Sequence, residues 1–297
     1  MFETGSLKNK VIQQTKLATE SGILIPAKIE DECIVTQSDI PYIVRIAPNL
    51  ERKDIARKKQ DDKAVEIGKA PNPFLPYNPN MFVSDLSETH LCLLNRFKLF
   101  DYPLLIVTRE FEEQQSVLTY DDFLSISLCM QEMEGVAFYN GGLKAGATQQ
   151  HKHFHFIPYP MDNHLSSIPI DNALKALPMD SELISLKNFP YRHLISRTKW
   201  SNNDLVEVVA KRLLSKYQAL MHSIGQKNSD RIVEDYNLII TRDWMKLALR
   251  SAPAYMSISL NALGFAGIFN VRNESQVNQV KELLPLKILQ GIGVAKE

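Results

Sequence analysis

Three histidines at alternate positions, His151, His153 and His155, are the feature that most constrains how this chain folds. They lie in residues 140–160, which read NGGLKAGATQQHKHFHFIPYP. Because a β-strand sends successive side chains to opposite faces, all three imidazoles would line one face of a strand. In a helix the same spacing would turn each histidine by roughly 200° from the last. The pattern therefore predicts a strand that presents three imidazoles together.

The histidine strand follows a loop that contains Gly141, Gly142 and Gly146. Glycine has no side chain, so the backbone of this loop can approach an anion closely and direct N–H groups at it. Residues 136–140 form an apolar run that predicts a strand leading directly into the loop. The two strands and the loop are therefore expected to form a hairpin-like unit that carries the site.

The charge balance and the cysteines exclude several classes of protein. Lys and Arg number 34, and so do Asp and Glu, so no net field would hold the chain to nucleic acid or an anionic membrane. Cys33, Cys92 and Cys129 show no C-x-x-C spacing, which indicates neither a disulfide framework nor a cysteine zinc site. Residues 1–16 lack the apolar core of a signal peptide, and no run of about 18 apolar residues occurs. A soluble, cytoplasmic protein is expected.

The order of elements predicts an α+β fold with a mostly antiparallel sheet flanked by helices, because strands and helices do not alternate regularly. Thr119 is expected to cap one of the helices, with Asp121 and Asp122 in its first turn. Residues 52–69 are highly charged and predict a surface segment, whereas prolines interrupt residues 166–199. Further periodicity predicts helices at 5–20, 119–133, 205–224 and 275–284, and strands at 30–35, 42–46, 93–97, 103–108, 236–241, 245–249, 256–260 and 267–271.

The chemistry of imidazole allows three interpretations of the alternating histidines. Ordinary polar residues on an exposed sheet face are disfavoured by the spacing and by the glycine loop. A single metal ion is disfavoured because the outer two Cα atoms of the strand would lie roughly 13 Å apart. The third interpretation is phosphoryl-group chemistry, in which a neutral imidazole attacks phosphorus and forms a covalent phosphoramidate. An ordinary pKa of about 6.5 leaves much of a histidine neutral at cellular pH, which suits this task.

Several separate motifs resemble one known family. GATQQHKHFH resembles the histidine-triad motif, and its form after the glycine loop is similar to that of the ATP adenylyltransferases, also called diadenosine tetraphosphate phosphorylases. APNL with Lys53, NPFLPYNP, LNRF and TREF are similar to the amino-terminal half of that family. YNLIITRDWM and NALGFAG are similar to its carboxy-terminal half. The resemblance covers nearly the whole chain, which is identified as a member of this family of the histidine-triad superfamily.

The resemblance implies a histidine-triad-like fold with a carboxy-terminal extension packed onto its sheet. It divides the chain into a catalytic region at 1–165, a connecting excursion at 166–204 and a region at 205–297 that completes the nucleotide site. It also implies a ping-pong reaction, in which diadenosine tetraphosphate gives ATP and an adenylylated histidine, and phosphate then releases ADP.

By position in the motif, His153 would be the nucleophile, His151 would support it, and His155 would lie near the phosphate and the leaving group. No covalent cofactor and no protein-bound metal are implied; Mg²⁺ is expected only as a counterion of the polyphosphate. The implied partners are small molecules, and the sequence carries no signal for the oligomeric state. Positions that match the family's substrate contacts are Lys53, Asn95, Arg96, Asn140, Gly146, Ala147, Thr148, Gln149, His155, Asn261, Ala262, Leu263, Ile268 and Arg272.

Two departures from the family leave alternatives open. Better-known members have glutamine where this chain has His155, whereas triad hydrolases have histidine there. Since an imidazole can donate a proton and an amide cannot act as an acid, a dinucleoside polyphosphate hydrolase stays an alternative, with a non-catalytic adenine-nucleotide sensor as another. Asp54 replaces the family's proline after Lys53, which weakens the assignment of Lys53. Phosphorolysis is predicted because typical triad hydrolases are much shorter and lack the carboxy-terminal motifs.

Overall fold

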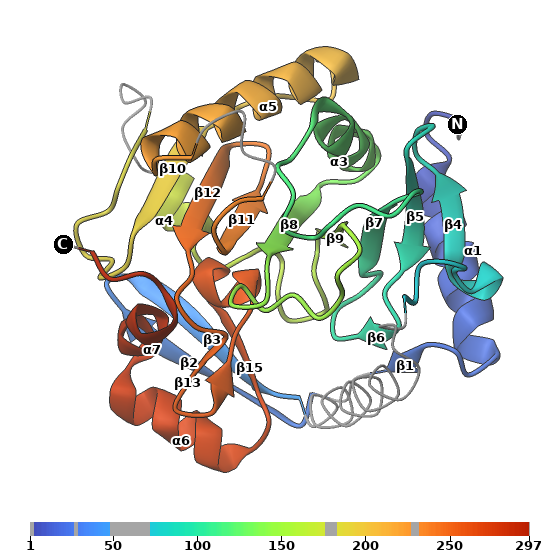
Figure 1. The fold of residues 1–297 in the computed structure, drawn as a ribbon. Coiled ribbons are helices and arrows are strands. Elements are labelled where there is room, and N and C mark those ends of the chain that lie inside the picture. The colour runs from blue at the N-terminus through green and yellow to red at the C-terminus, as the bar shows by residue number, and fades with distance from the viewer. Residues whose placement is uncertain (1–2, 27–28, 48–71, 176–182, 227–231, 297) are drawn as a thin grey trace, which may run out of the picture.

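An eight-stranded sheet lies at the centre of the molecule (Figure 1). The structure is a computed structural model, which describes residues 3–26, 29–47, 72–175, 183–226 and 232–296. Every pair of neighbouring strands in this sheet is antiparallel. In spatial order the strands are β10 (His193–Arg197), β12 (Trp244–Leu249), β11 (Tyr236–Ile240), β8 (Gly135–Gly141), β9 (His153–Pro158), β7 (Leu104–Thr108), β5 (His90–Leu94) and β4 (Phe82–Asp85).

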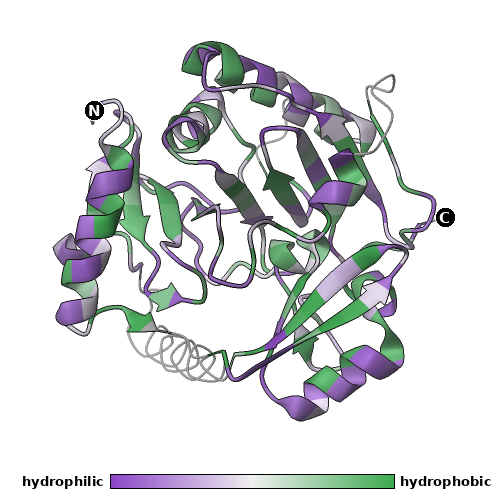
Figure 2. Ribbon diagram, turned by 180° about the vertical axis from the view of Figure 1, so that it is seen from behind, coloured by the Kyte–Doolittle hydropathy of each residue, from purple (hydrophilic) through white to green (hydrophobic). Residues whose placement is uncertain are grey.

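One face of the large sheet is covered by α1 (Leu7–Glu20), α3 (Tyr120–Glu132) and α5 (Val206–Ser223). Hydrophobic and hydrophilic segments alternate along α1 (Figure 2), as expected for a helix with one buried face. The predicted cap of α3 is confirmed, because the Thr119 hydroxyl accepts from the Asp122 N–H while the Asp122 carboxylate accepts from the Thr119 N–H. The buried side chains between these helices and the sheet form the first core.

A second, three-stranded sheet packs on the opposite face of the large sheet. It consists of β2 (Asp31–Gln37), β3 (Ile40–Ile46) and β15 (Ile268–Val271), and it is flanked by α6 (Glu274–Leu283) and α7 (Pro285–Ile292). Because β15 pairs in parallel with β3, segments near the two ends of the sequence lie side by side (Figure 1). Apolar residues from both sheets and both helices form the second core.

A third, smaller cluster covers the same face of the large sheet at its β4–β5 end. Phe74 packs there against Leu91, Leu93, Leu105 and Val107. A short 3₁₀ helix, η1 (Pro79–Met81), connects this covering segment to β4. The histidine strand β9 lies between the second core and this third cluster, so the triad face is enclosed from both sides.

The structure differs from the sequence prediction at several elements. Residues 256–260 are not one strand, since Met256 (φ 45°) and Ser257 (φ 70°) form the turn between β13 (Ala254–Tyr255) and β14 (Ile258–Ser259). The strand expected at 93–97 is also wrong in its bounds, because β5 ends at Leu94 and Phe97–Lys98 forms β6, which pairs with β1 (Ile25–Pro26). The sequence prediction missed α7, α4 (Asp171–Lys175), β4, β10 and η2 (Ala262–Ala266).

The predicted fold class is confirmed: the molecule is α+β, with a large antiparallel sheet flanked by helices. The carboxy-terminal part contributes β11 and β12 to the large sheet in addition to packing on it. The boundaries predicted at 165 and 205 stay a prediction. The charged segment at 52–69, with Lys53, lies outside the described residues. Within the described parts of the chain, no helix is long and apolar enough to cross a membrane.

Candidate active site

The predicted alternation along the histidine strand is confirmed. Phe154 and Phe156 point into the first core, on the helix side of the sheet. His153 and His155 belong to the opposite face, where their strand neighbours Val107 and Leu105 pack in the third cluster. His151 precedes β9, and its backbone forms an isolated antiparallel β-bridge with Glu113. The strand therefore separates its structural side chains from its candidate catalytic ones by alternation alone.

The His151 ring is fixed by hydrogen bonds at both nitrogens. Its Nε2–H donates to the Thr108 carbonyl oxygen at 2.8 Å, which leaves Nδ1 to accept from the Asn72 amide at 2.9 Å. Burial lowers the pKa of His151, so this neutral tautomer is favoured. Phe74 and Phe111 contact the ring edge-on. Such a residue is suited to supporting a neighbour rather than to attacking a substrate.

His153 adopts the opposite tautomer. Its Nδ1 lies 2.8 Å from the carbonyl oxygen of His151, and since a carbonyl only accepts, Nδ1 carries the proton. In the neutral ring Nε2 then carries the lone pair that a nucleophile needs. The ring lies between Phe74 and His155, with centroid distances of 5.3 Å to each. This geometry is compatible with the role of nucleophile that the family motif implies for His153.

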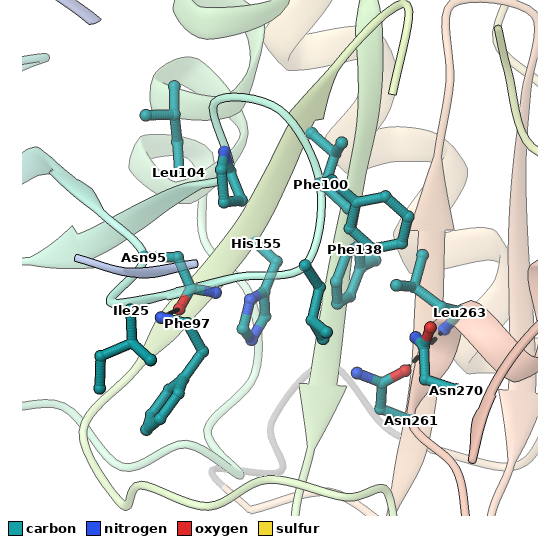
Figure 3. A pocket seen from close by; sticks show the side chains of 13 residues that line it. Ile25, Asn95, Phe97, Phe100, Leu104, Phe138, His155, Asn261, Leu263 and Asn270 are labelled. Carbon is teal, nitrogen blue, oxygen red and sulfur yellow. Dashed lines mark hydrogen bonds between the residues drawn. The ribbon is translucent and has the colours of Figure 1, made fainter. Parts of the chain in front are cut away.

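His155 stacks face to face on Phe138, at 4.6 Å between ring centroids and 4° between ring planes. It lines a cavity of about 60 Å³, the narrow pocket, together with Asn261, Leu263 and Asn270 from the carboxy-terminal part. Figure 3 shows His155 and Phe138 side by side, with these carboxy-terminal residues across the pocket. The remaining lining residues are Ile25, Asn95, Phe97, Leu99, Phe100, Pro103, Leu104 and Ile157.

A second cavity of about 260 Å³, the polar cavity, adjoins the narrow pocket and shares Leu99, Asn261 and Asn270 with it. Lys144 from the glycine loop and Arg272 from the end of β15 both line it. No acidic side chain is among its lining residues in the described part of the chain. Two cationic side chains that line one cavity favour an anionic occupant.

The glycine loop needs glycine at two positions. Gly142 (φ +108°) and Gly146 (φ +89°) lie in the left-handed region, where other residues are strained. A Cβ atom at Gly142 would also lie 2.5 Å from a carboxylate oxygen of Asp235. That carboxylate accepts from the backbone N–H of Lys144 at 2.6 Å, so Asp235 fixes the loop. The glycine loop, which is predicted to bind an anion, is therefore held by a residue just before β11.

Asn140 connects the glycine loop to the carboxy-terminal part. Its side-chain oxygen accepts from the Asn237 amide at 2.8 Å and from the Ala262 N–H at 3.0 Å. Arg250 donates to the Asn237 side-chain oxygen at 2.6 Å, and burial lowers the pKa of Arg250 to about 9. The two halves of the chain thus build one site through buried polar contacts.

The predicted substrate contacts fall into distinct groups. Asn95, His155, Asn261 and Leu263 line the narrow pocket, and Gly146, Thr148, Asn261, Ile268 and Arg272 line the polar cavity. Among the remaining predictions, the Ala262 N–H is occupied by Asn140, and Ala147 is buried. Arg96 is exposed, and neither it nor Gln149 lines either cavity.

Sequence reasoning missed several residues that shape the site, among them Asn72, Gln114, Asn237, Arg250 and Asn270. Four of them act through contacts between distant segments, which leave no local pattern. Asn270 alternates along β15 with Phe269 and Val271, a spacing that gives its direction but not its neighbour. Within the described parts of the chain its buried side-chain oxygen has no hydrogen-bond partner, and such an oxygen marks a position where a ligand donor is expected. In the described residues no group of three or more His, Cys, Asp and Glu is arranged to hold a metal ion.

Comparison with known proteins agrees with this architecture. The family model for the Ap4A phosphorylase N-terminal domain matches residues 1–176, and that for the ATP adenylyltransferase C-terminal domain matches residues 187–295. The chain therefore belongs to the Ap4A phosphorylase family, as its motifs predict.

Two relatives from Saccharomyces cerevisiae extend over most of the chain. Diadenosine 5',5'''-P1,P4-tetraphosphate phosphorylase 2 is 24% identical over 93% of this chain and 90% of its own length. The protein APA1 is 23% identical over 83% of this chain and 80% of its own length. The crystal structure of yeast Ap4A phosphorylase Apa2 has the same fold, with a TM-score of 0.80, 22% identity and full coverage of both chains. Apa2 has also been solved in complex with Ap4A, and that structure matches equally well, with a TM-score of 0.80.

Proposed function

We propose that this protein is an enzyme that cleaves diadenosine tetraphosphate (Ap4A) with inorganic phosphate to ATP and ADP. The observation that carries the proposal is the tautomer of His153, whose proton is on Nδ1 and whose lone pair is on Nε2. This ring lies beside a pocket lined by His155 and close in sequence to a glycine loop. Family membership and the Ap4A complex of the yeast relative support the same substrate.

The first step is attack of His153 Nε2 on the phosphorus that bears one adenosine. The N–P bond forms as the bond from that phosphorus to the bridging oxygen breaks, and the electron pair leaves with ATP. Nδ1 keeps its proton, and the His151 carbonyl oxygen stabilises the positive charge that the ring acquires. In the second step a phosphate oxygen attacks the same phosphorus, the N–P bond breaks and ADP leaves with the ring neutral again.

The two cavities suit the two kinds of group in this substrate. The narrow pocket offers apolar walls at Phe138 and Leu263, which suit an adenine ring. The Asn270 amide oxygen, which has no hydrogen-bond partner among the described residues, suits the amino group of that ring. The polar cavity, with Lys144 and Arg272, suits the polyphosphate. Mg²⁺ would enter only as a counterion bound to that polyphosphate, and the reaction would take place in the cytoplasm.

Product analysis tests the proposal. Ap4A is incubated with the protein and ³²P-labelled phosphate, and the products are separated by chromatography. The expected result is label in ADP together with an equal amount of unlabelled ATP. In the absence of phosphate, acid-labile adenylylated protein should accumulate, because the second step lacks its nucleophile. Unlabelled AMP and ATP in the presence of phosphate would contradict phosphorolysis.

A hydrolase is the second candidate function, and His155 is the observation that favours it. Its imidazole lines the narrow pocket, where it could donate or accept a proton, which an amide at this position could not. In that case water rather than phosphate would attack adenylyl-His153. The ratio of AMP to ADP among the products at increasing phosphate concentration separates the two functions. A phosphorylase forms more ADP and less AMP as phosphate increases, whereas the products of a hydrolase do not change.

A further inference from the structure

Gln114 makes an unusual set of contacts around the proposed nucleophile. The residue is 4% exposed, and its side-chain oxygen accepts from the backbone N–H of His153 at 2.9 Å. Its side-chain nitrogen donates to the carbonyl oxygens of His153 at 3.2 Å and of Asn140 at 3.0 Å. A single amide thus joins the backbone of the histidine strand to the end of β8.

These contacts take the place of a backbone-to-backbone pairing that is missing between β8 and β9. The β8–β9 pairing runs from Gly135 opposite Pro158 to Phe138 opposite His155, and two residues further along the same register would place Asn140 opposite His153. The pairing of the two strands ends before that pair, although Asn140 belongs to β8 and His153 to β9. There the His153 N–H reaches the Asn140 carbonyl oxygen only through the Gln114 amide. The amide acts as a spacer that holds the two strands apart.

The backbone of Gln114 is itself held in place on both sides. Its N–H donates to the Gln150 carbonyl oxygen at 2.7 Å, and its carbonyl oxygen accepts from the Tyr139 hydroxyl. Gln150 lies just before the triad, and Tyr139 lies just before Asn140. The residue therefore contacts the histidine strand before His151 and at His153, and β8 at Tyr139 and Asn140.

We propose that Gln114 is a positioning residue that sets the location of His153 relative to Asn140 and the glycine loop. The His153 ring takes its direction from the backbone, because Nδ1 donates to the carbonyl oxygen two residues earlier. A shift of that backbone displaces Nε2 from the phosphorus, and a misplacement of about 1 Å can cost about 100-fold in rate. This inference rests on the proposed function only in taking His153 as the nucleophile.

Two substitutions test whether position 114 needs the amide hydrogen-bond donor or only a side chain of this size. In Gln114→Glu the shape is kept, but the atom that faces two carbonyl oxygens carries no proton when ionised. In Gln114→Met the shape is nearly kept and all hydrogen bonds are lost. Both variants should reduce the single-turnover rate of His153 adenylylation by about 100-fold at pH 8. The dissociation constant for AMP should change less than about threefold, since Asn237 and Ala262 still hold the Asn140 side chain.

The pH dependence supplies a readout that a purely structural role would not give. A buried glutamic acid beside two carbonyl oxygens has a raised pKa, and its protonated form can again donate one hydrogen bond. The rate deficit of Gln114→Glu relative to the wild type should therefore shrink as the pH falls from 8 to 6. The deficit of Gln114→Met should stay constant over this range.

Gln131→Glu is the matched control, because Gln131 also donates to two carbonyl oxygens but lies on α3, away from the triad. It should transfer adenylate at the wild-type rate. If the Gln114 variants do not fold, Tyr139→Phe removes only the hydroxyl that holds the Gln114 carbonyl oxygen and should slow transfer about three- to tenfold.

Three results would overturn the proposal. One is transfer within about threefold of the wild-type rate in both Gln114 variants. Another is an equal loss of AMP affinity and rate, with a lower melting temperature, which would indicate a structural residue. The third is a deficit of Gln114→Glu that does not change with pH. Failure of the wild-type protein to become adenylylated would instead contradict the proposed function, so the two failures are distinct.

Discussion

His153 and His193 occupy equivalent positions at the first residues of β9 and β10 in the large sheet. Each donates from Nδ1 to the carbonyl oxygen two residues earlier, His153 to His151 at 2.8 Å and His193 to Tyr191 at 2.7 Å. Each packs against aromatic rings with centroids between 5.1 and 5.3 Å away. The same local sequence geometry therefore produces the same tautomer twice in one sheet.

The two rings differ in what surrounds them. His193 Nε2 accepts from the backbone N–H of Leu186 at 2.9 Å, so its lone pair is used within the protein. Burial, with the nearby positive charge of Lys246, lowers the pKa of His193 to about 3. His153 instead adjoins His155 and, through it, the narrow pocket. The Nδ1 contact alone therefore does not distinguish a candidate catalytic histidine from a structural one, whereas the position beside the pocket does.

The largest expected effect is the loss of catalysis in His153→Ala. Without the nucleophile, adenylylation should be absent and turnover of Ap4A should fall by at least about 1000-fold. The unfolding free energy should fall by about 1 to 2 kcal/mol, because the buried ring packs against Phe74 and His155 but its removal leaves no backbone N–H known to lose an acceptor. Kinetic assays and urea unfolding measure the two quantities on one preparation. Near-normal turnover would show that His153 is not the attacking group.

His193→Ala should give the reverse result. The substitution removes a buried ring and leaves the Leu186 N–H without its acceptor, which should lower the unfolding free energy by about 3 kcal/mol. Adenylylation per folded molecule should stay within about twofold of the wild type. Titration of active sites with Ap4A in the absence of phosphate gives that ratio. A catalytic loss as large as that of His153→Ala would erase the distinction between the two histidines.

The lowered pKa of His193 also predicts how the unfolding free energy depends on pH. Because the folded-state pKa of His193 is about 3 and the unfolded value is about 6.5, the unfolded chain binds a proton that the folded protein does not between these values. Stability should therefore fall as the pH decreases, by about 2 kcal/mol from this group between pH 6.5 and pH 5. Lys246 and Lys296, which face the ring, both disfavour its protonation.

His193→Gln is the variant that isolates this contribution. Its unfolding free energy should decrease about 2 kcal/mol less than that of the wild type over the same pH range, measured by urea unfolding. Both proteins keep His151, whose pKa is also lowered by burial, so that contribution cancels in the difference. Parallel curves for the two proteins would mean that His193 is protonated in the folded state.

Features that depend on local periodicity could be predicted from the sequence. The alternation of the histidines, the cap at Thr119 and the hairpin of β8 and β9 follow from neighbouring residues, and the structure confirms them. Most of the substrate contacts that the family motifs named within the described residues line one of the two cavities. These signals are short-range or come from residue identity.

Contacts between distant segments could not be predicted in the same way. Asn72 meets His151 across 79 residues, and Asn237 meets Asn140 across 97. Gln114 is one polar residue in a polar stretch, and only the separation of β8 from β9 shows what its amide does. His193 shows the converse, because nothing in its sequence indicates that both ring nitrogens are occupied. Partners of polar groups depend on tertiary packing, which no single-sequence pattern encodes.

The smallest expected effect concerns His155, the histidine that stacks on Phe138 beside His153. His155→Gln keeps a polar group of similar reach at the wall of the narrow pocket but removes the ability to exchange a proton. If the imidazole helps water attack adenylyl-His153, the ratio of AMP to ADP formed in the presence of phosphate should fall by about tenfold, while adenylylation slows by less than about tenfold. His155→Ala is the control, since it should lose stacking and lower both product rates together. An unchanged AMP to ADP ratio in His155→Gln would mean that this position does not decide between water and phosphate as the acceptor.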